Sequence, residues 1–457
     1  MIVVLLGLVG LGIMVFVHEL GHFVAAKANG VVVETFSLGW GPRLVGFRHG
    51  GTMYQISWLP IGGFCKMKGE ITPGVAGGGD TGAPGKQDSR GSFNAAPAWR
   101  RIIISAAGPL FNLAFAVIVS TFVWWIGYSE PSFDNRIVLA SDYGLDVSAQ
   151  VAPATLAGLK TGDRVLSING APVENYRDIQ EDVSVAPNNK LLFVVAREEN
   201  AATRNLDISV TPYLDKDTGA GHVGILPWVD TVLGSVTPGS PASVAGLRKG
   251  DRLLKVDGKP VNNIWDLLPV LASSPGKVTV DFERQGAVHS VPLVYERTDH
   301  PGADFPEKVL GIGPTIKEYQ SPRLGFPAAL EKGLGETWSN AALTVKGIGL
   351  LFQGVNVRKA VAGPLRIIDF IGTVAVGGGA VNALRILALL SVVLFLMNLL
   401  PIPAMDGGQI VIFLVEIVRG KAVPINLFWR IQIIGFSILL ALIVVVSFND
   451  VLSLFGR

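Results

Sequence analysis

Apolar residues in this chain gather in four long runs, and polar segments of very different length separate them. The runs cover residues 2–28, 101–128, 383–418 and 428–448. As a helix, each run is long enough to cross a bilayer core of roughly 30 Å. The third run is interrupted at Pro401, and a membrane span tolerates such a break only where neighbouring helices or a water-filled cavity satisfy the freed backbone groups. The pattern predicts a polytopic α-helical membrane protein with four transmembrane helices.

The composition agrees with this class of protein. The mean hydropathy of the 457 residues is +0.45 and only 16% of them are charged, which is too apolar for an ordinary soluble protein. The formal net charge of +2 gives no indication of a nucleic-acid partner. The single cysteine, Cys65, excludes an intramolecular disulfide. The first run lacks a basic region and a small-residue cleavage site, so we expect a retained span and not a signal peptide.

Charge in the connecting segments predicts an orientation. The loop after the first run and the loop between the third and fourth runs carry an excess of lysine and arginine, whereas the long segment between the second and third runs is acidic overall. The positive-inside rule then places both termini and the long segment outside. The protein is expected in a bacterial inner membrane, in contact with the lipid bilayer.

The connecting segments also differ in their predicted structure. Residues 29–70 contain three short strand-like stretches, at 31–36, 43–47 and 54–58, and predict a β-rich loop. The other connections are predicted as a flexible cytoplasmic loop (71–100), an extracytoplasmic linker (299–382), a cytoplasmic loop (419–427) and an extracytoplasmic tail (449–457). Within the linker, 334–352 and 365–374 have the pattern of amphipathic helices lying on the outer membrane face.

The long acidic segment contains an internal repeat. Residues 157–170 and 245–258 share the block Gly-Leu-x-x-Gly-Asp-Arg, a strand-like stretch and Asn/Asp-Gly, and both copies continue with Pro-Val one residue later. These blocks resemble PDZ domains of the bacterial protease type, which predicts one domain over 129–215 and another over 216–298. Such domains can bind an extended peptide by strand addition, or they can act only as a spacer or lid. The sequence leaves this choice open.

The candidate chemistry begins in the first run, where residues 18–22 read His-Glu-Leu-Gly-His. On a helix, His18 and His22 lie on one face and can ligate a single zinc ion, while Glu19 is placed to take a proton from the attacking water. Two histidines and a carboxylate are expensive in hydrocarbon, so a functional site is the default reading of this cluster. The alternative is a helix end whose polar side chains face water.

A catalytic zinc usually takes three protein ligands. Asp406 is the best third candidate, because it is the acid in the third run whose depth could match that of the two histidines. Its alternative role is to cap the helix that resumes at Gly407. The other histidines are poor candidates, because they fall in a predicted turn (His49) or in or just after the repeats (His222, His289 and His300).

With these motifs the chain resembles the site-2 protease family, in its bacterial branch with two PDZ domains. The similarity covers nearly the whole chain. Besides the residues at 18–22, it rests on Gly-Trp-Gly-Pro at 39–42, Pro-Ile-Gly-Gly-Phe at 60–64, Ala-Gly-Pro-Leu-Phe-Asn at 107–112 and Asn-x-x-Pro-x-Pro-x-x-Asp-Gly at 398–407. Met405 stands where the family usually has leucine, which is a conservative apolar replacement.

The resemblance implies roles for seven residues. Zinc would be bound by His18, His22 and Asp406, and Glu19 would be the general acid/base. An unwound substrate segment would be held by Asn398, Pro401 and Pro403. The β-rich loop would be re-entrant, dipping into the membrane to present a strand edge to that segment.

These features predict an intramembrane zinc metalloendopeptidase that acts in regulated intramembrane proteolysis. Its substrates would be single-span membrane proteins already trimmed outside, such as an anti-sigma factor in an envelope stress response, or remnant signal peptides. One rival is a membrane receptor or scaffold that uses its PDZ-like pair and has a degenerate metal site. A zinc-dependent transporter is a weaker rival, because it would call for more spans and a second polar site at mid-membrane.

Overall fold

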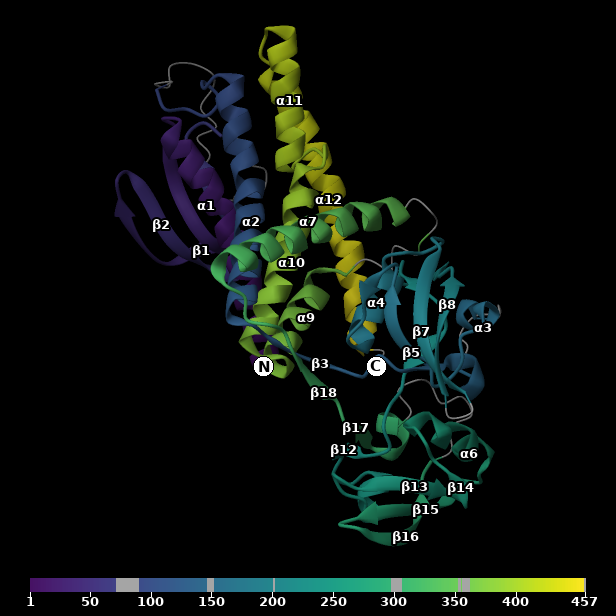
Figure 1. Ribbon diagram of the computed structural model, residues 1–457. Helices are drawn as coiled ribbons and strands as arrows, with labels where there is room; N and C mark the ends of the chain where they lie inside the picture. The colour runs from purple at the N-terminus through teal and green to yellow at the C-terminus, as the bar shows by residue number, and fades with distance from the viewer. Residues whose placement is uncertain are drawn as a thin grey trace. The chain divides into compact units, whose positions relative to one another are not determined.

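The computed structural model describes residues 1–70, 90–145, 152–199, 202–296, 306–351, 355 and 362–455. The chain folds into two compact units, one made of Met1–Tyr128 with Gln320–Arg457 and the other of Ser129–Tyr319 (Figure 1). The first unit holds the apolar runs and the second holds both copies of the repeat. Most of the predicted flexible loop, residues 71–89, lies outside the described residues.

Four helices in the described ranges are long and apolar enough to cross a membrane. They are α1 (Ile2–Ala28), α2 (Ala98–Ile126), α10 (Gly379–Leu399) and α12 (Ile425–Phe455). The third apolar run forms two helices, because α10 ends at Leu399 and α11 (Asp406–Arg419) begins after a turn that contains Pro401. The break predicted from the proline is therefore present, and α12 extends beyond the predicted 428–448 at both ends.

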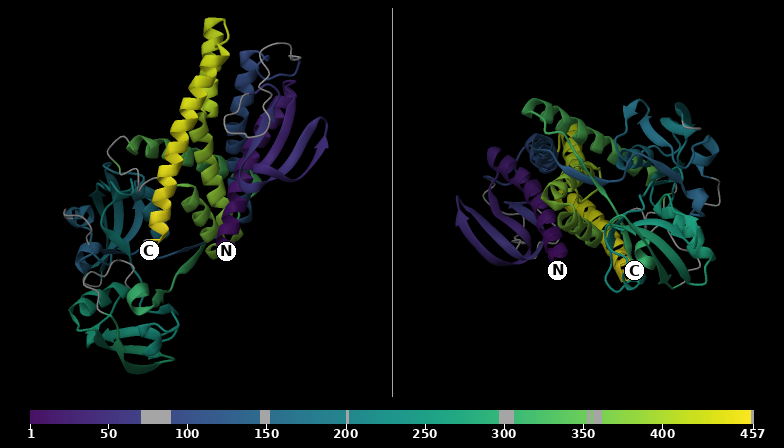
Figure 2. Two further views of the ribbon diagram at one scale, coloured as in Figure 1. Left: turned by 180° about the vertical axis from the view of Figure 1, so that it is seen from behind. Right: turned by 60° about the horizontal axis from the view of Figure 1, so that its bottom comes forward.

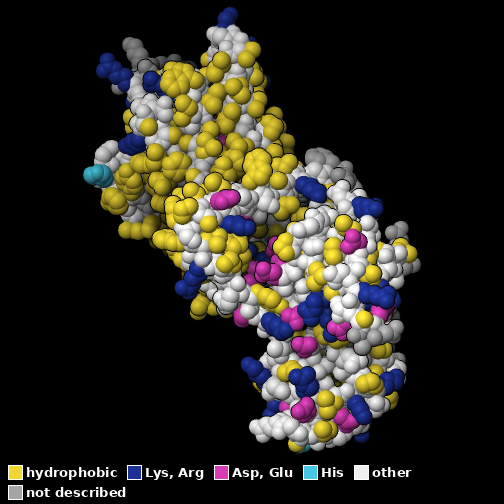
Figure 3. Space-filling model, viewed as in Figure 1, with side chains coloured by type: hydrophobic (Ala, Val, Ile, Leu, Met, Phe, Trp, Pro, Cys, Tyr) yellow, Lys and Arg dark blue, Asp and Glu magenta, His cyan; other side chains and the backbone are white. Residues whose placement is uncertain are grey.

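The outer faces of these helices are apolar. Ile118 of α2 is 67% exposed, and Ile438 and Phe448 of α12 are 64% and 65% exposed. On the face seen in Figure 3, hydrophobic side chains predominate over the helical unit, in contrast to the mixed surface of the repeats. A patch of this size would drive aggregation in water, whereas lipid chains cover it at no such penalty. The chain is a multi-pass membrane protein.

The β-rich loop consists of two long strands, β1 (Val33–His49) and β2 (Thr52–Met67). The expectation of three separate short strands was wrong, because the chain bends at Gly39 and Gly41, whose φ angles of 89° and 94° suit glycine, and pairing continues past them. Phe36 lies beside both Cys65 and Tyr54, so the inner segments of the sheet are paired on both sides. Figures 1 and 2 show this sheet alongside α1.

Two further helices of this unit brace the spans. α7 (Phe326–Leu351) packs on α2 and begins earlier than the predicted 334–352, and α9 (Pro364–Gly377) packs on α1. The start of α9 is tied to α12, because the Asp450 carboxylate accepts hydrogen bonds from the backbone N–H groups of Gly363 and Arg366, both at 3.2 Å. A carboxylate at a helix N-terminus satisfies otherwise unpaired donors.

The second unit contains the repeat as two sheets with the same strand order. The first sheet has the order β6 (Ala171–Pro172), β5 (Arg164–Ile168), β7 (Leu191–Glu199) and β8 (Ala202–Val210). The second has the order β14 (Lys259–Pro260), β13 (Arg252–Val256), β15 (Lys277–Arg284) and β16 (Ala287–Val294). The helices α4 (Tyr176–Ser184) and α6 (Leu267–Ser273) occupy corresponding places after β6 and β14.

Short elements complete each domain. Hydrogen bonds join β11 (Ile225–Pro227) to β4 (Ile137–Leu139), and β17 (Ile312–Pro314) to β12 (Leu233–Val236). Residues 225–227 are therefore tied to the first repeat and 312–314 to the second, beyond the limits of 215 and 298 predicted from sequence. The remaining described elements are β3 (Ser129–Ser132), η1 (Ala140–Tyr143), α3 (Pro153–Ala157), β9 (Tyr213–Leu214), β10 (Gly221–His222), α5 (Pro241–Val244), η2 (Ile264–Asp266), η3 (Pro306–Leu310) and β18 (Lys317–Gln320).

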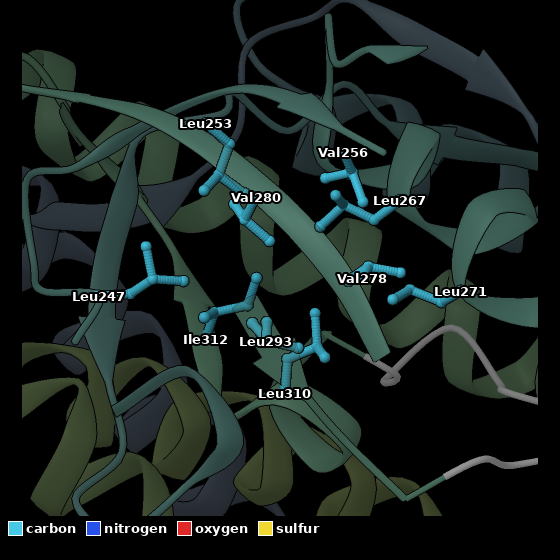
Figure 4. Close-up of a pocket in the computed structure, with 10 residues that line it drawn as sticks. All are labelled: Leu247, Leu253, Val256, Leu267, Leu271, Val278, Val280, Leu293, Leu310 and Ile312. Carbon is cyan, nitrogen blue, oxygen red and sulfur yellow. The ribbon is translucent and has the colours of Figure 1, made fainter. Parts of the chain in front are cut away.

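Each repeat has a hollow beside its helix. The core of the second encloses a gap of about 10 Å³ lined only by aliphatic side chains, including Leu247, Leu267 and Leu310 (Figure 4). This is room for about one water, and the apolar walls keep it dry. In the first domain, a hollow of about 380 Å³ lies between α4, β3 and β11, with Arg177 and Gln180 on its wall.

Candidate metal centre

Three of the predicted ligands meet at one point inside the helical unit. His18 and His22 are buried on one face of α1, and their Nε2 atoms are 3.2 Å apart. Asp406, the first residue of α11, places Oδ2 3.2 Å from His18 Nε2 and Oδ1 3.5 Å from His22 Nε2. One ligand atom from each residue lies within 4.8 Å of the others. The third ligand therefore comes to the histidines from a helix at the other end of the chain.

The donor set fits a zinc ion. Asp406 Oδ2 is buried and accepts no hydrogen bond among the described residues, because it faces His18 Nε2 at 3.2 Å, a nitrogen that carries no proton when it serves as a metal ligand. Asp406 does not occupy the N-cap position of α11, which is Met405. The lone pairs of two imidazoles and one carboxylate face a common point, and a cation there removes their repulsion. Two histidines and one carboxylate, with a fourth position left open, are a usual donor set for catalytic zinc.

Helix α2 orients both imidazole rings. His22 Nδ1 lies 2.8 Å from the backbone carbonyl of Ile104, which makes Nδ1 the protonated nitrogen and leaves the Nε2 lone pair for the metal. The fully buried amide of Asn112 lies 3.2 Å from His18 Nδ1. When His18 Nε2 binds a metal, the proton of the ring is on Nδ1, which then donates a hydrogen bond. The acceptor for this hydrogen bond must be the amide oxygen of Asn112, since the amide nitrogen can only donate.

The close approach of α2 to α1 depends on two glycines. A Cβ at Gly108 would overlap His22 Nε2 and lie 2.9 Å from His18 Cε1. A Cβ at Gly21 would in turn overlap the carbonyl oxygen of Ala107. Glycine at both positions lets the two backbones come close enough for Ile104 and Asn112 to reach the rings.

Glu19 lies between the ligands and the β sheet. The backbone N–H of Cys65 in β2 donates a hydrogen bond to its carboxylate. A Cβ at Gly63, two residues earlier in β2, would lie 3.4 Å from Glu19 Cγ. The segment of β2 around Gly63 is therefore the part of the sheet that lies next to the predicted general acid/base.

Helix α11 is held in register against α2 by polar contacts along its length. Ser105 Oγ donates to Gln409 Oε1 at 3.2 Å, one turn after Asp406. Further along, Arg101 and Glu416 form an ion pair in which both side chains are buried. Breaking a buried pair leaves an uncompensated charge, so this contact strongly favours one register of the two helices. That register sets the depth of the Asp406 carboxylate.

A family model described as Peptidase family M50 matches residues 6–442 of this chain. The chain belongs to peptidase family M50. It is 37% identical to a putative zinc metalloprotease of Treponema pallidum, with all of both chains covered. It is 31% identical to the regulator of sigma-E protease RseP of Escherichia coli K12 and 33% identical to a putative zinc metalloprotease of Neisseria meningitidis, with 97% of each chain covered in both comparisons.

As an M50 peptidase the protein is an intramembrane zinc metalloprotease of the site-2 type, with Zn²⁺ as its cofactor. When bound, zinc supplies Lewis acidity, which polarises the scissile carbonyl and eases ionisation of the attacking water. The predicted fold class and enzyme class are confirmed. The roles of the individual side chains rest on the geometry given above.

The predicted substrate-binding residues flank the turn between α10 and α11. Asn398 is half-buried in the last turn of α10. Pro401 is exposed and Pro403 is half-buried within the turn. All three precede Asp406 by eight residues or fewer along the chain, and their contact with substrate stays a prediction.

Sequence reasoning missed the contribution of α2 to the metal centre. Asn112 carries a readable signal, because an amide inside an apolar span is costly and suggests a site. The carbonyl of Ile104 carries no such signal, since every residue has one and only the packing of α1 on α2 selects it.

Proposed function

We propose that this protein cleaves peptide bonds within the transmembrane segments of single-span membrane proteins whose outer domain has already been removed. Anti-sigma factors and remnant signal peptides are substrates of this kind. The observation that carries the proposal is the meeting of His18, His22 and Asp406 inside the spans with Glu19 beside them. The Escherichia coli relative is named as a regulator of sigma-E protease, which supports this substrate class.

In this proposal each polar side chain has a separate task. His18, His22 and Asp406 hold the metal, with the two rings fixed by Asn112 and the Ile104 carbonyl. Glu19 accepts the proton of the attacking water and passes it to the leaving amide nitrogen, which departs as an amine. The hydrogen bond from the Cys65 N–H keeps the Glu19 carboxylate turned towards β2.

The substrate must be unwound before it can be cut. A helix occupies its own carbonyls with internal hydrogen bonds, so the scissile bond has to be presented as an extended strand. The sheet of β1 and β2 supplies strand edges next to Glu19, and Asn398, Pro401 and Pro403 would hold the unwound segment from the other side. Substrates with glycine or proline near the scissile bond should therefore be cut faster than those with leucine there, and indifference to these residues would contradict the mechanism.

The deciding experiment measures zinc content and cleavage of a model substrate together. Wild-type protein should hold about one zinc per chain and lose activity on chelation. Glu19→Gln should keep the zinc and abolish cleavage, whereas His22→Phe and Asp406→Ala should lose the metal itself. An active Glu19→Gln protein would refute the assignment of Glu19 as the general acid/base, whereas a wild-type protein that neither holds zinc nor cleaves would favour a receptor or scaffold.

The orientation is part of the proposal, with the termini and repeats outside and the loops 29–100 and 419–427 in the cytoplasm. In a Cys65→Ser background, a cysteine placed at exposed Val288 should react with a membrane-impermeant maleimide added to intact spheroplasts. A cysteine at exposed Lys421 should react only after permeabilisation. The reverse labelling pattern would overturn the orientation.

We further propose that the repeats act mainly as a size filter. The short connection Ser129-Glu130-Pro131 leaves the inserted unit little freedom to swing aside. Deleting residues 134–296 should then permit cleavage of untrimmed substrate and leave trimmed substrate largely unaffected. Loss of cleavage of trimmed substrate alone would favour recruitment, for which the 380 Å³ hollow between α4 and β11 is the natural groove.

A further inference from the structure

Helix α12 carries a buried amide at the level of the turn before Asp406. Gln432 is 3% exposed, in a helix that is otherwise largely apolar. Its Oε1 accepts a hydrogen bond of 2.8 Å from the backbone N–H of Ala404. A polar side chain inside a span is costly in hydrocarbon and usually marks a functional requirement.

The turn that Gln432 contacts is strained. Ala404 has a φ of 75°, in the left-handed region that residues with a Cβ rarely adopt. The turn is also tight, with Met405 N donating to Ile402 O at 3.1 Å and Ile402 N donating to Leu400 O at 2.7 Å. A conformation of this kind persists only where surrounding contacts hold it.

A second contact from the same face of α12 holds the turn. Gly435 lies three residues after Gln432, so both face the same side of the helix. A Cβ at Gly435 would overlap both the side chain and the carbonyl of Pro403. The backbone of α12 therefore lies directly against the turn, and Gln432 pairs the backbone N–H next to that contact.

We propose that Gln432 is a positioning residue for the metal centre, acting through the Ala404 amide to fix the turn that delivers the Asp406 carboxylate. Ala404 is two residues before Asp406, so rotation of its peptide would swing the start of α11 away from the two histidines. This proposal rests on the assignment of Asp406 as a metal ligand. It makes the fourth span a part of the metal site and more than an anchor.

The amide nitrogen of Gln432 argues against a role in packing alone. Gln432 Nε2 is buried and has no hydrogen-bond partner within the described ranges. An unpaired buried donor costs roughly 1–3 kcal/mol. Leucine would fill a similar volume without this penalty, so a role in packing alone would favour leucine. The hydrogen bond to Ala404 is what glutamine provides and leucine does not.

The test compares Gln432→Leu, which removes the acceptor, with Gln432→Glu, which keeps an acceptor oxygen at the same reach. Ile434→Ala, at a 60% exposed site on the same helix, is the control. Zinc affinity is measured on purified full-length protein by competition with a chelator. The thermal unfolding of the metal-free protein is followed in parallel.

We expect Gln432→Leu to weaken zinc binding by roughly 10- to 100-fold, as loss of an outer contact to a ligand does, with little change in the unfolding temperature of the metal-free protein. Gln432→Glu and Ile434→Ala should bind zinc within about threefold of wild type, well inside that range. Gly435→Ala, which displaces the same turn by overlap, should also weaken zinc binding and serves if the leucine variant does not fold. Unchanged zinc affinity in Gln432→Leu, or equal losses in the leucine and glutamate variants, overturns the proposal. A wild-type protein without zinc would instead refute the proposed function.

Discussion

Asp406 in the helical unit differs in its pairing from two buried aspartates of the repeats. In the repeats, Asp163 accepts two hydrogen bonds from Arg197, both at 2.8 Å, and Asp251 accepts two from Arg284, both at 2.7 Å. Each also accepts a backbone N–H three residues upstream. The Asp406 side chain in the helical unit is 15% exposed, against 1% for each of these two, and its buried Oδ2 faces only an imidazole nitrogen, His18 Nε2 at 3.2 Å, and accepts no hydrogen bond within the described residues.

This difference in hydrogen bonding distinguishes an aspartate that stabilises the fold from one that is available to bind a ligand. A carboxylate that is fully paired by its own domain holds a loop in place and has no capacity left for a ligand. A buried carboxylate that is left incomplete raises the free energy of the folded protein unless a cation completes it. Asp163 and Asp251 are thus structural elements of the repeats, whereas Asp406 has the capacity that the proposed metal ligand needs.

The strongest way to break this comparison is to neutralise Asp406. Asp406→Asn should lower zinc affinity by more than the roughly 10- to 100-fold that an outer contact contributes, and abolish cleavage. The metal-free variant should be at least as stable as metal-free wild type, because it no longer buries an incomplete charge. Zinc content and the unfolding temperature test both parts, and a variant that keeps its zinc contradicts the ligand assignment.

Adding one methyl group to α2 beside His18 and His22 tests whether the close packing of α1 and α2 is needed for zinc binding. Gly108→Ala should weaken zinc binding strongly, because the new Cβ would overlap His22 Nε2. Gly12→Ala is the matched control, since no described atom lies within 4 Å of a Cβ at that position in α1. Chelator competition measures both variants. Equal zinc affinities would show that the helices move apart without consequence.

Neutralising an aspartate of the repeats should give the reverse result. Asp163→Asn leaves the mostly buried Arg197 without its charged partner and should destabilise the first domain by about 3 kcal/mol, the lower end for a broken buried pair. Asp251→Asn should cost less, because Arg284 is more exposed. Hydrogen exchange of β7 and β15 in the intact protein reports each loss. Zinc content should stay at the wild-type level, and a fall would mean that the repeats support the metal centre.

The smallest expected effect is on the acid stability of the second domain. Burial alone would raise the pKa of Asp251, but hydrogen bonds from Arg284 and the Arg248 N–H hold that pKa below its ordinary value. Its contribution to stability is therefore complete above about pH 4, the pKa of the unfolded group, and is lost as the pH falls through the lower pKa of the folded state. Hydrogen exchange of β15 between pH 6 and pH 3 should show this loss. Asp251→Asn should show a smaller pH dependence, and an equal one would contradict the pairing.

Local features of the fold could be predicted from sequence, and distant packing could not. The spacing of His18 and His22 needs only one helix, and the block around Asp163 recurs around Asp251 because each copy folds within its own domain. The pairing of Asp406 with the histidines could be argued only from depth in the membrane. The contacts of Asn112 and Gln432 depend on how helices far apart in the chain pack, and no local pattern encodes that packing.

The β-rich loop shows the same limit in another form. The strand-like stretches at 43–47 and 54–58 and most of 31–36 do lie in strands, but the sequence could not show that Phe36 would pair on both sides. Whether a glycine ends a strand or only bends it depends on the partner available across the sheet. At Gly39 the partner is β2, and the strand continues.

The position of Asp406 on α11 also sets when the enzyme can first work during its own synthesis. Both histidines leave the ribosome with the first span, whereas α11 follows the whole repeat unit. At a synthesis rate of about 5–20 residues per second the interval is on the order of tens of seconds. Throughout that time the histidine pair lacks the Asp406 carboxylate. A partly synthesised chain is therefore inactive as a protease while other membrane proteins are being inserted beside it.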